Sequence, residues 1–490
     1  MMRAMIDALA GRVLPRIFGA LAVATFVAGC MVGPDYVRPT APAPAEFKEA
    51  QGWKVAQPQD TAPRGEWWTA FDDADLDALV TQVDVTNQTV LAAAAKVREA
   101  RAAIQAARAG LFPTVSGNAS ALRSQRATGT VGPSGTVGQG ITNSYNVALD
   151  VSWEIDLWGG VRRGIEASTA TAQASDADLG AAKLSLQSLL AQDYLLLRVQ
   201  DAQIDLLRET VANYERSLQL TRNQYAAGIV ARGDVAQAET QLKSTQAQLL
   251  DARIVRAQLE HAIAVLVGKP PAELTITPKN LAMVFPQIPL TVPSELLERR
   301  PDIASAERKV AAANAQIGVA QAAFFPSLSL GATGGFQSSA IASLFSLPSR
   351  FWSLGPALAQ TIFDAGLRAA QKEEAVATWE GTVATYRQTV LTAFQEVEDN
   401  LTALSILEQE SGVQDEAVKA AQESAAIANN QYRAGTANYL AVIVLQAAAL
   451  NNERTALDIK GRRLTASVAL IKALGGGWSA ASLAETSAKD

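Results

Sequence analysis

The chain has 490 residues and a formal net charge of −6, with 18% charged and 6% aromatic residues. Its basic residues are dispersed, which argues against a nucleic-acid partner. One Cys and one His leave little material for a nucleophile–base pair or a metal cluster. We therefore expect neither an enzyme nor a metal site nor a cofactor.

The N-terminus has the features of a secretory signal. Three arginines precede an apolar stretch over 17–27, and small residues then lead into Cys30, the only cysteine. This arrangement resembles a bacterial lipoprotein signal, which implies removal of 1–29 and lipidation of Cys30, with palmitate among the acyl chains. Because Met31 follows rather than Asp, outer-membrane anchoring is favoured. An ordinary signal peptide with an incidental cysteine is the alternative.

After the signal, we expect residues 30–70 to form a lipid anchor followed by an extended, Pro-rich strap. No later window approaches the roughly 20 apolar residues that a membrane-spanning helix requires. If the mature chain crosses a membrane, we expect it to do so with β-strands.

The rest of the chain is an internal duplication. Asn223–Gly228 recurs as Asn430–Gly435, 207 positions later, and Phe112-Pro113 recurs as Phe325-Pro326, at 213. In each copy an Ala-rich helix ends at Phe-Pro, and a β-hairpin, a long helix, a Tyr-x-x-Gly turn and a second helix follow. The predicted segments are repeat 1 (71–270, with a helix at 75–110, a hairpin at 113–158 and a turn near 228), a linker (271–293), repeat 2 (294–478, with a helix at 294–323, a hairpin at 326–364 and a turn near 435) and a tail (479–490).

The clearest strand signal runs from Tyr145 to Leu157, where apolar and polar residues alternate over about 13 positions, as in a strand between lipid and lumen. Trp153 and Trp158 are candidates for an interfacial aromatic girdle. The other predicted strands are 114–123, 326–336 and 351–363, the last being irregular because it contains Pro356. A soluble β-sandwich is the alternative.

Four strands are too few to close a membrane barrel, because the smallest barrels use about eight and open edges are excluded from hydrocarbon. Two chains would give eight strands with a filled interior, whereas three give twelve and a usable lumen. We therefore predict a homotrimer.

Two long helices, 163–226 and 370–434, contain no proline, and 64 helical residues span roughly 95 Å. Narrow apolar seams and wide Gln/Ser/Thr faces suit a closed ring of helices that is wet inside and outside. An ordinary coiled-coil spacer would fit the helices equally well. The pairs Glu373-Glu374 and Glu396 with Glu398 look like solvated helix faces.

Several motifs together resemble the TolC-type outer-membrane efflux factors, in the OprM/NodT lipoprotein branch. The resemblance covers essentially the whole mature chain. The residues that carry it are Gly33-Pro34-Asp35-Tyr36-x-Arg38-Pro39, Trp67-Trp68-x-x-Phe71 with Asp75-Leu76, Leu297-Glu298-Arg299-Arg300-Pro301-Asp302-Ile303, both Phe-Pro pairs and both Tyr-x-x-Gly turns.

The resemblance implies an α+β membrane protein. Its trimer would combine a twelve-stranded outer-membrane β-barrel, four strands per chain, with a long periplasmic α-helical barrel and a small equatorial domain. Such a protein passively conducts drugs or other small molecules, including antibiotics, out of the cell. Its implied partners are a periplasmic adaptor protein, an inner-membrane RND-type pump reached through the adaptor, and outer-membrane lipid. A periplasmic adaptor and a structural coiled-coil lipoprotein are the alternatives.

The resemblance also implies that the turns form the gate and dock the adaptor. The candidate residues are Tyr225, Gly228, Asp234, Tyr432, Gly435, Leu440 and Val444. Positions that are acidic or Arg in relatives read Ala437, Ala441 and Val444 here, so an apolar constriction is expected in place of an acidic ring. A simple turn tyrosine at Tyr432 and a helix N-cap at Asp234 are the alternative interpretations.

If Tyr432 and Asp234 hold the gate closed, Asp234→Ala combined with Tyr432→Phe raises vancomycin uptake or single-channel conductance. Unchanged uptake and conductance would remove both residues from the gate.

Overall fold

The computed structural model describes residues 31–44, 46–49, 66–125, 141–279, 284–286, 288 and 299–478. Cys30, the signal segment and the tail lie outside the described residues. The chain divides into two compact units. Unit 1 takes its described residues from Met1–Pro39, Arg98–Gln173 and Glu307–Thr385, and unit 2 from Thr40–Val97, Ala174–Ala306 and Tyr386–Asp490.

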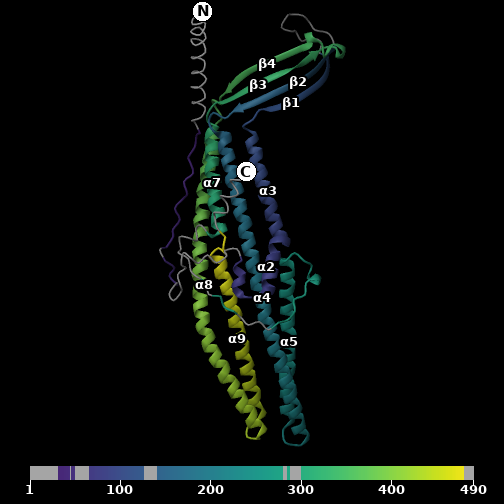
Figure 1. Cartoon of the computed structure of the whole chain (residues 1–490), viewed down its shortest axis with the longest axis vertical. Helices are drawn as coiled ribbons and strands as arrows, with labels where there is room; N and C mark the ends of the chain where they lie inside the picture. The colour runs from purple at the N-terminus through teal and green to yellow at the C-terminus, as the bar shows by residue number, and fades with distance from the viewer. Residues whose placement is uncertain are drawn as a thin grey trace, which may run out of the picture. The chain divides into compact units, whose positions relative to one another are not determined.

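Unit 1 contains a four-stranded antiparallel sheet in the order β1-β2-β3-β4 (Figure 1). One hairpin comes from each predicted repeat, and β2 joins them by pairing with β3. Within the described residues, β1 and β4 each have a strand on one side only. The strands are β1 (Thr114–Gln125), β2 (Ile141–Ile155), β3 (Ser327–Ser338) and β4 (Arg350–Ala359).

The register gives the sheet one apolar and one polar face. Val151 is paired with Val115 and Ala332, and Leu328 with Leu358, so large apolar side chains share a face across all four strands. On the opposite face Asp150 accepts hydrogen bonds from Asn118 Nδ2 and Thr333 Oγ1, both at 2.6 Å. The alternation predicted from Tyr145 onward is therefore continued by the neighbouring strands.

The prediction for the last strand was wrong at its end. It ends at Ala359, and 360–363 are not in a strand. Arg368 donates to the Thr361 carbonyl at 2.8 Å and to the Asp364 carboxylate at 2.5 Å. These bonds fix the segment between the strand and the helix that begins at Leu367. Pro356 is compatible with β4 because an edge strand can hold a residue that has no N–H to donate.

The segment after Cys30 packs against helices of the same unit. Arg163, fully buried, donates to the carbonyls of Val32 and Gly33 at 3.2 Å and to Asp35 at 2.8 Å. Val32 N–H donates to the Trp158 carbonyl at 3.0 Å. The segment that contains the Gly-Pro-Asp-Tyr motif thus binds Arg163 and Trp158, which follow β2 in the chain.

A close glycine contact makes this packing possible. A Cβ on Gly318 would lie 2.8 Å from Arg163 Cγ, and one on Gly33 would lie 2.4 Å from Gly318 Cα. We expect Gly318→Ala to displace Arg163 and to lower the free energy of unfolding by about 1–3 kcal/mol, measured by denaturation in detergent. Hydrogen exchange over 31–38 should accelerate.

Gly164→Ala is the matched control, because a Cβ there meets nothing within 4 Å and Ala favours helix. An equal loss of stability in both variants would contradict the proposed contact.

The helices include the two predicted long hairpins, and each hairpin pairs 67 residues with 35. Among the described residues no helix is both long enough and apolar enough to cross a membrane. The helices are η1 (Trp67–Phe71), α2 (Ala74–Thr86), α3 (Gln88–Ala109), α4 (Gly160–Ala226), α5 (Arg232–Leu266), η2 (Pro271–Glu273), α7 (Pro301–Ala322), η4 (Ile341–Ser343), η5 (Leu347–Ser349), α8 (Leu367–Arg433) and α9 (Tyr439–Ala473).

The helix predicted over 75–110 is in fact two, because Asn87 interrupts it. Asn87 Oδ1 accepts from the N–H groups of Thr89 and Val90 and caps α3, while its Nδ2 donates to the Leu266 carbonyl at 2.8 Å. A buried Asn that serves a neighbouring helix as well as its own cap cannot stay inside a continuous helix. In the second copy, Arg300 is not helical and α7 begins at Pro301, while the predicted start over 294–298 lies outside the described residues.

Two further residues depart from prediction. Glu396 binds the buried Arg300 at 2.7 Å, and Glu398 accepts from the N–H groups of Lys48 and Glu49 at 2.7 and 2.9 Å. Arg300 also binds Asp302 at 2.7 Å. Burial alone would lower the pKa of Arg300, but the two carboxylates outweigh it and raise that pKa. Both glutamates are therefore structural partners rather than parts of a solvated face.

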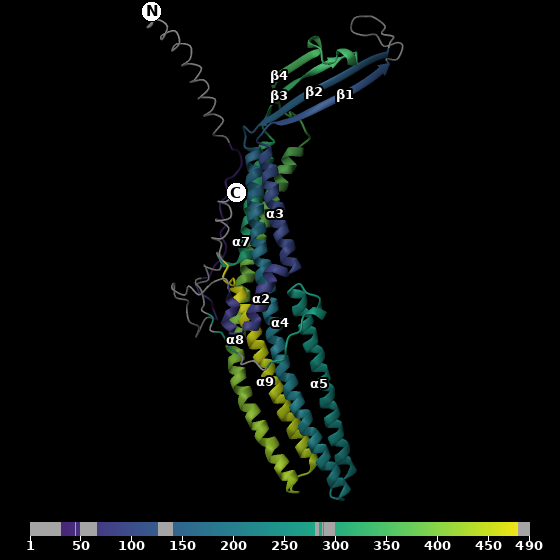
Figure 2. The same cartoon turned by 45° about the vertical axis from the view of Figure 1, so that its right-hand side comes forward.

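The main core of unit 2 gathers the Trp-Trp-x-x-Phe motif against α2 and the long helices. Figure 2 shows α2 beside α4. Trp67 and Trp68 pack edge to face at 5.8 Å, and Phe71 is almost fully buried. Asp73 caps α2 and also accepts from Tyr194 of α4 at 2.7 Å. The motif therefore fixes the segment before α2 onto the first long hairpin.

Candidate gate at the hairpin tips

Both Tyr-x-x-Gly turns close by the same backbone geometry. Gly228 and Gly435 each have φ of 74°, in the left-handed region that favours glycine. Ile229 N–H donates to the Gln224 carbonyl at 2.9 Å, and Thr436 N–H donates to the Gln431 carbonyl at 2.9 Å. This is the Schellman ending of a helix. A Cβ at either glycine would meet nothing within 4 Å, so the backbone conformation alone requires glycine.

Next to the turns, a small apolar cluster joins the two hairpins within unit 2. The rings of Tyr432 and Tyr439 lie 5.1 Å apart, and Ser217 Oγ is 3.1 Å from the Tyr439 hydroxyl. Burial raises the pKa of Tyr439, which keeps its phenol neutral. The cluster comprises Tyr214, Leu218, Ala238, Leu242, Ala428, Tyr432, Tyr439 and Val442.

The two polar gate candidates have different partners. The buried Tyr432 donates its hydroxyl to Gln224 Oε1 of the other hairpin at 2.5 Å. Asp234 accepts from its own helix, from Ala231 N–H at 3.3 Å. Ala231 is the N-cap, so the interpretation of Asp234 as an N-cap is wrong by three positions. Sequence reasoning missed Gln224, whose only signal is its place beside Tyr225 in the repeated Asn-Gln-Tyr.

The apolar gate candidates are exposed. Leu440 and Val444 are 52% and 55% exposed and lie one turn apart on α9. The half-buried Ala441 follows Leu440 on α9, and the half-buried Ala437 lies in the turn before that helix. Ile229, which sequence reasoning missed, is 71% exposed beside the first turn and follows Gly228 directly.

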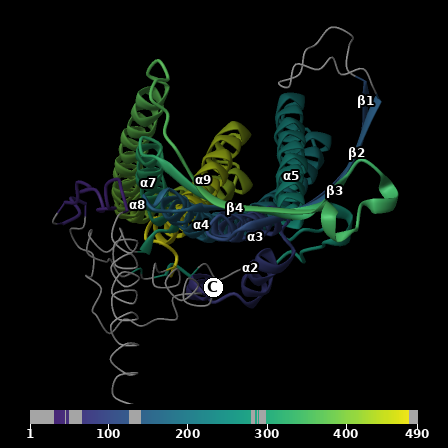
Figure 3. The same ribbon diagram turned by 90° about the horizontal axis from the view of Figure 1, so that it is seen from above.

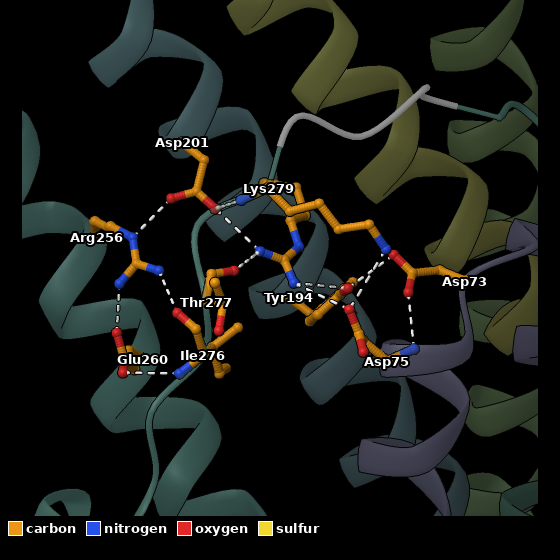
Figure 4. A network of polar contacts seen from close by, with 10 residues as sticks. Asp73, Asp75, Tyr194, Asp201, Arg256, Glu260, Ile276, Thr277 and Lys279 are labelled. Carbon is orange, nitrogen blue, oxygen red and sulfur yellow. Dashed lines mark hydrogen bonds and ion pairs between the residues drawn. The ribbon is translucent and has the colours of Figure 1, made fainter.

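A buried ionic network holds α4 and α5 together farther from the tips (Figure 4). Asp201 of α4 binds Arg256 of α5 at 2.6 Å and Arg198 of its own helix at 3.1 Å. Arg198 also lies over the Tyr194 ring, 4.7 Å from its centroid. Burial alone would lower the pKa of Arg198, but its interactions with Tyr194 and then with Asp201 outweigh that effect and raise the pKa. The buried Arg198 therefore stays charged in the interior.

The same network binds the backbone of Ile276 and Thr277, which follow α5 in the chain (Figure 4). Arg256 donates to the Ile276 carbonyl at 2.6 Å, and Arg198 donates to the Thr277 carbonyl at 2.8 Å. Glu260 accepts from Ile276 N–H at 3.0 Å. The start of the predicted linker is thus fastened across α4 and α5. Sequence reasoning missed it because these charges are far apart in the chain.

Removing Asp201 leaves the buried Arg198 and the partly buried Arg256 without their shared carboxylate. We expect Asp201→Ala to lower the free energy of unfolding by about 3–5 kcal/mol. Asp205→Ala, one turn along the same helix, removes only an exposed pair with Arg208 and should cost less than about 1 kcal/mol. Denaturant titration followed by circular dichroism measures both. Equal losses would show that the network contributes no more than a surface ion pair.

Within the described residues, no three His, Cys, Asp or Glu side chains cluster as metal ligands.

The family model described as Outer membrane efflux protein matches residues 79–269 and 292–476. The chain is 34% identical over 463 residues to the Probable efflux pump outer membrane protein TtgC of Pseudomonas putida, covering 94% of this chain and 95% of the relative. It is 31% identical to the Cation efflux system protein CusC of Escherichia coli, covering 93% and 97%. The solved structure of the outer-membrane channel OprN superposes with a TM-score of 0.85 at 32% identity, covering 92% and 100%.

A four-stranded sheet, two long helical hairpins and a match in both repeats define an outer-membrane channel of the TolC-like class. The chain belongs to the outer membrane efflux protein family. The family resemblance, the fold class and the outer-membrane location predicted from the sequence are confirmed. The adaptor alternative finds no support among these relatives.

Proposed function

We propose that three copies of this chain form one passive channel, lipid-anchored through Cys30. In the proposed assembly it conducts small molecules from a periplasmic adaptor and an inner-membrane RND-type pump to the exterior. The observation that carries this proposal is the sheet, which has one apolar face and, among the described residues, two edges without a neighbouring strand. Backbone groups at an edge cannot be left unpaired in hydrocarbon. Three sheets of four strands remove every edge and enclose a lumen lined by the polar face.

The proposed gate is a ring of apolar side chains at the helix tips. Each chain would contribute Leu440 and Val444, which are exposed beside a well-packed cluster. Narrow apolar constrictions resist wetting, so such a ring can close a duct without charged groups. Tyr432 and Gln224 hold the two hairpins of one chain together. An adaptor that binds more tightly when the hairpin tips are spread apart would shift the tips toward opening.

The proposal requires no catalysis by this chain, and it leaves the choice of cargo to the pump. Relatives from differently named efflux systems support this: TtgC carries the name of an efflux pump and CusC that of a cation efflux system, and the two have similar identity to this chain.

Conductance in planar lipid bilayers tests the gate. Purified wild-type protein should conduct weakly at rest. Leu440→Ser combined with Val444→Ser should raise the conductance severalfold, because a polar ring wets more readily. The same variant should sensitise cells to vancomycin.

Val85→Ser is the control, since Val85 is an exposed apolar residue on α2. Conductance that rises equally in the control, or does not rise in the tip variant, would remove the gate from the tips. A tip variant with no conductance in any preparation would contradict the channel itself.

A further inference from the structure

The sheet of unit 1 is joined to helices at one end only. β1 follows α3 and β2 leads into α4, while β3 follows α7 and β4 leads into α8. The connections within the two hairpins therefore lie at the opposite end of the sheet, here called the hairpin end (Figure 1). In the proposed channel the helices extend into the periplasm, so the hairpin end lies in the outer leaflet of the membrane.

The charged residues of the four strands are divided between the two faces of the sheet. The strands contain two acids and two arginines. Asp150 lies on the polar face, and Glu154 shares that face because it lies four residues farther along β2. Both arginines, Arg123 and Arg350, lie on the apolar face. The face that meets lipid in the proposed channel thus carries both of the basic residues in these strands.

The strand register places the arginines there. Arg123 lies eight residues after Val115 in β1, and side chains an even number of residues apart share a face. Arg350 is paired with Phe336, which lies four residues after Ala332 in β3. Val115 and Ala332 both belong to the apolar face. Since β1 ends at 125 and β4 begins at 350, both arginines also lie at the hairpin end.

Both arginines are exposed, and neither side chain has a hydrogen bond or ion pair with another residue that the structure describes. A cation that faces lipid costs several kcal/mol at the bilayer midplane but about 0–1 kcal/mol near the interface. Trp352, which is 75% exposed, lies two residues from Arg350 on the same face. Because tryptophan is typical of the interface, its position supports a place for the arginines at the level of the lipid headgroups.

The connection from β3 to β4 also lies at the hairpin end (Figure 3). Its residues, 339–349, include no charged side chain. The Ser346 and Ser349 hydroxyls both donate to the Ser343 carbonyl, at 2.7 and 2.8 Å. The large residues left exposed are Ile341, Phe345 and Leu347. A connection whose hydroxyls bind its own backbone and whose exposed side chains are apolar suits contact with lipid.

An aromatic contact joins this connection to the apolar face. The Phe345 ring packs edge to face on Phe336, with 5.6 Å between the ring centroids. Phe336 is the residue paired with Arg350. Arg350, Trp352, Phe336 and Phe345 therefore form one patch, here called the outer-rim patch, in which a cation adjoins three aromatic rings.

Arg123 completes the outer-rim patch in the proposed trimer. When three four-stranded sheets close into a ring, β4 of one copy is followed by β1 of the next. Arg350 of one copy and Arg123 of the next then share the outward face near the hairpin ends of adjacent strands. Two guanidinium groups beside apolar rings are complementary to an anionic headgroup with acyl chains, because guanidinium matches phosphate geometry.

We propose that the outer-rim patch binds lipopolysaccharide, the phosphorylated glycolipid of the outer leaflet. Arg350 and Arg123 of the next copy bind its phosphate groups, and Phe336, Phe345 and Trp352 contact its acyl chains. Each junction between copies then holds one glycolipid, so the inference rests on the proposed trimeric channel. The bound lipid would cover the β4–β1 junctions on their outward side.

Native mass spectrometry of the full-length protein, stripped of non-covalent lipid in detergent, measures bound lipid and the number of chains together. The probe is lipid A that carries both of its phosphates. We expect it to bind wild-type trimers, and Arg123→Ala combined with Arg350→Ala should raise the dissociation constant about tenfold or more, because charge-assisted hydrogen bonds to phosphate are lost. Arg123→Lys combined with Arg350→Lys should retain most of the binding, since lysine also binds phosphate.

Lys96→Ala combined with Lys419→Ala is the matched control, because it removes two exposed cations from α3 and α8 and should leave the dissociation constant unchanged. Equal weakening in the two alanine pairs would overturn the inference. Dephosphorylated lipid A or phosphatidylglycerol that bound as tightly as lipid A would also overturn it. Trimers that bind lipid A independently of the arginines would overturn this inference alone, whereas monomers would overturn the trimeric channel as well.

Discussion

The need to satisfy backbone hydrogen bonds at the two edge strands of one four-stranded sheet constrains the rest of this protein. β1 and β4 each pair on one side within the described chain, while one face of the sheet is apolar across all four strands. An apolar face suits lipid, and lipid offers no partner for the free N–H and C=O groups of an edge. In the proposed trimer, other copies of the chain satisfy both requirements at once.

The duplication extends the same logic to the helices. Each repeat supplies one β-hairpin and one helical hairpin, and inside the chain the repeats meet through β2 with β3 and through α4 with α9. Among the described residues, one strand edge from each repeat is left unpaired, at β1 and at β4. A chain built from two similar halves therefore presents, to its neighbours, surfaces that resemble those it has already paired internally.

Much of this architecture was readable from the sequence because it depends on local patterns. Alternation from Tyr145 predicted β2, proline-free stretches predicted α4 and α8, and the repeated glycines located both turns. Each signal lies within a few neighbouring residues, where backbone preferences and side-chain period act directly.

The misses share the opposite property. Asn87 breaks a helix through its bond to Leu266, and Glu396 is held by Arg300. Asp201 gains its second arginine, Arg256, from another helix. At the candidate gate, the partner of Tyr432 is Gln224, on the other hairpin. Such pairings are set by tertiary packing, so a residue's immediate neighbours in the sequence do not reveal them.

The motifs that suggested the family now have physical roles. The Gly-Pro-Asp-Tyr segment docks on the buried Arg163, the paired tryptophans fill the core of unit 2, and the Arg-Pro-Asp segment begins α7 with a buried ion pair. These motifs position the strap and the helices, whereas the candidate gate has no charged signature of its own.

Native mass spectrometry of the detergent-extracted protein tests most directly the claim that three copies share one channel, because it counts the chains in the assembly. The account predicts a single dominant species containing three lipidated chains. A dominant species of one or two chains, stable and folded, would show that the sheet edges are satisfied in some other way and would contradict it.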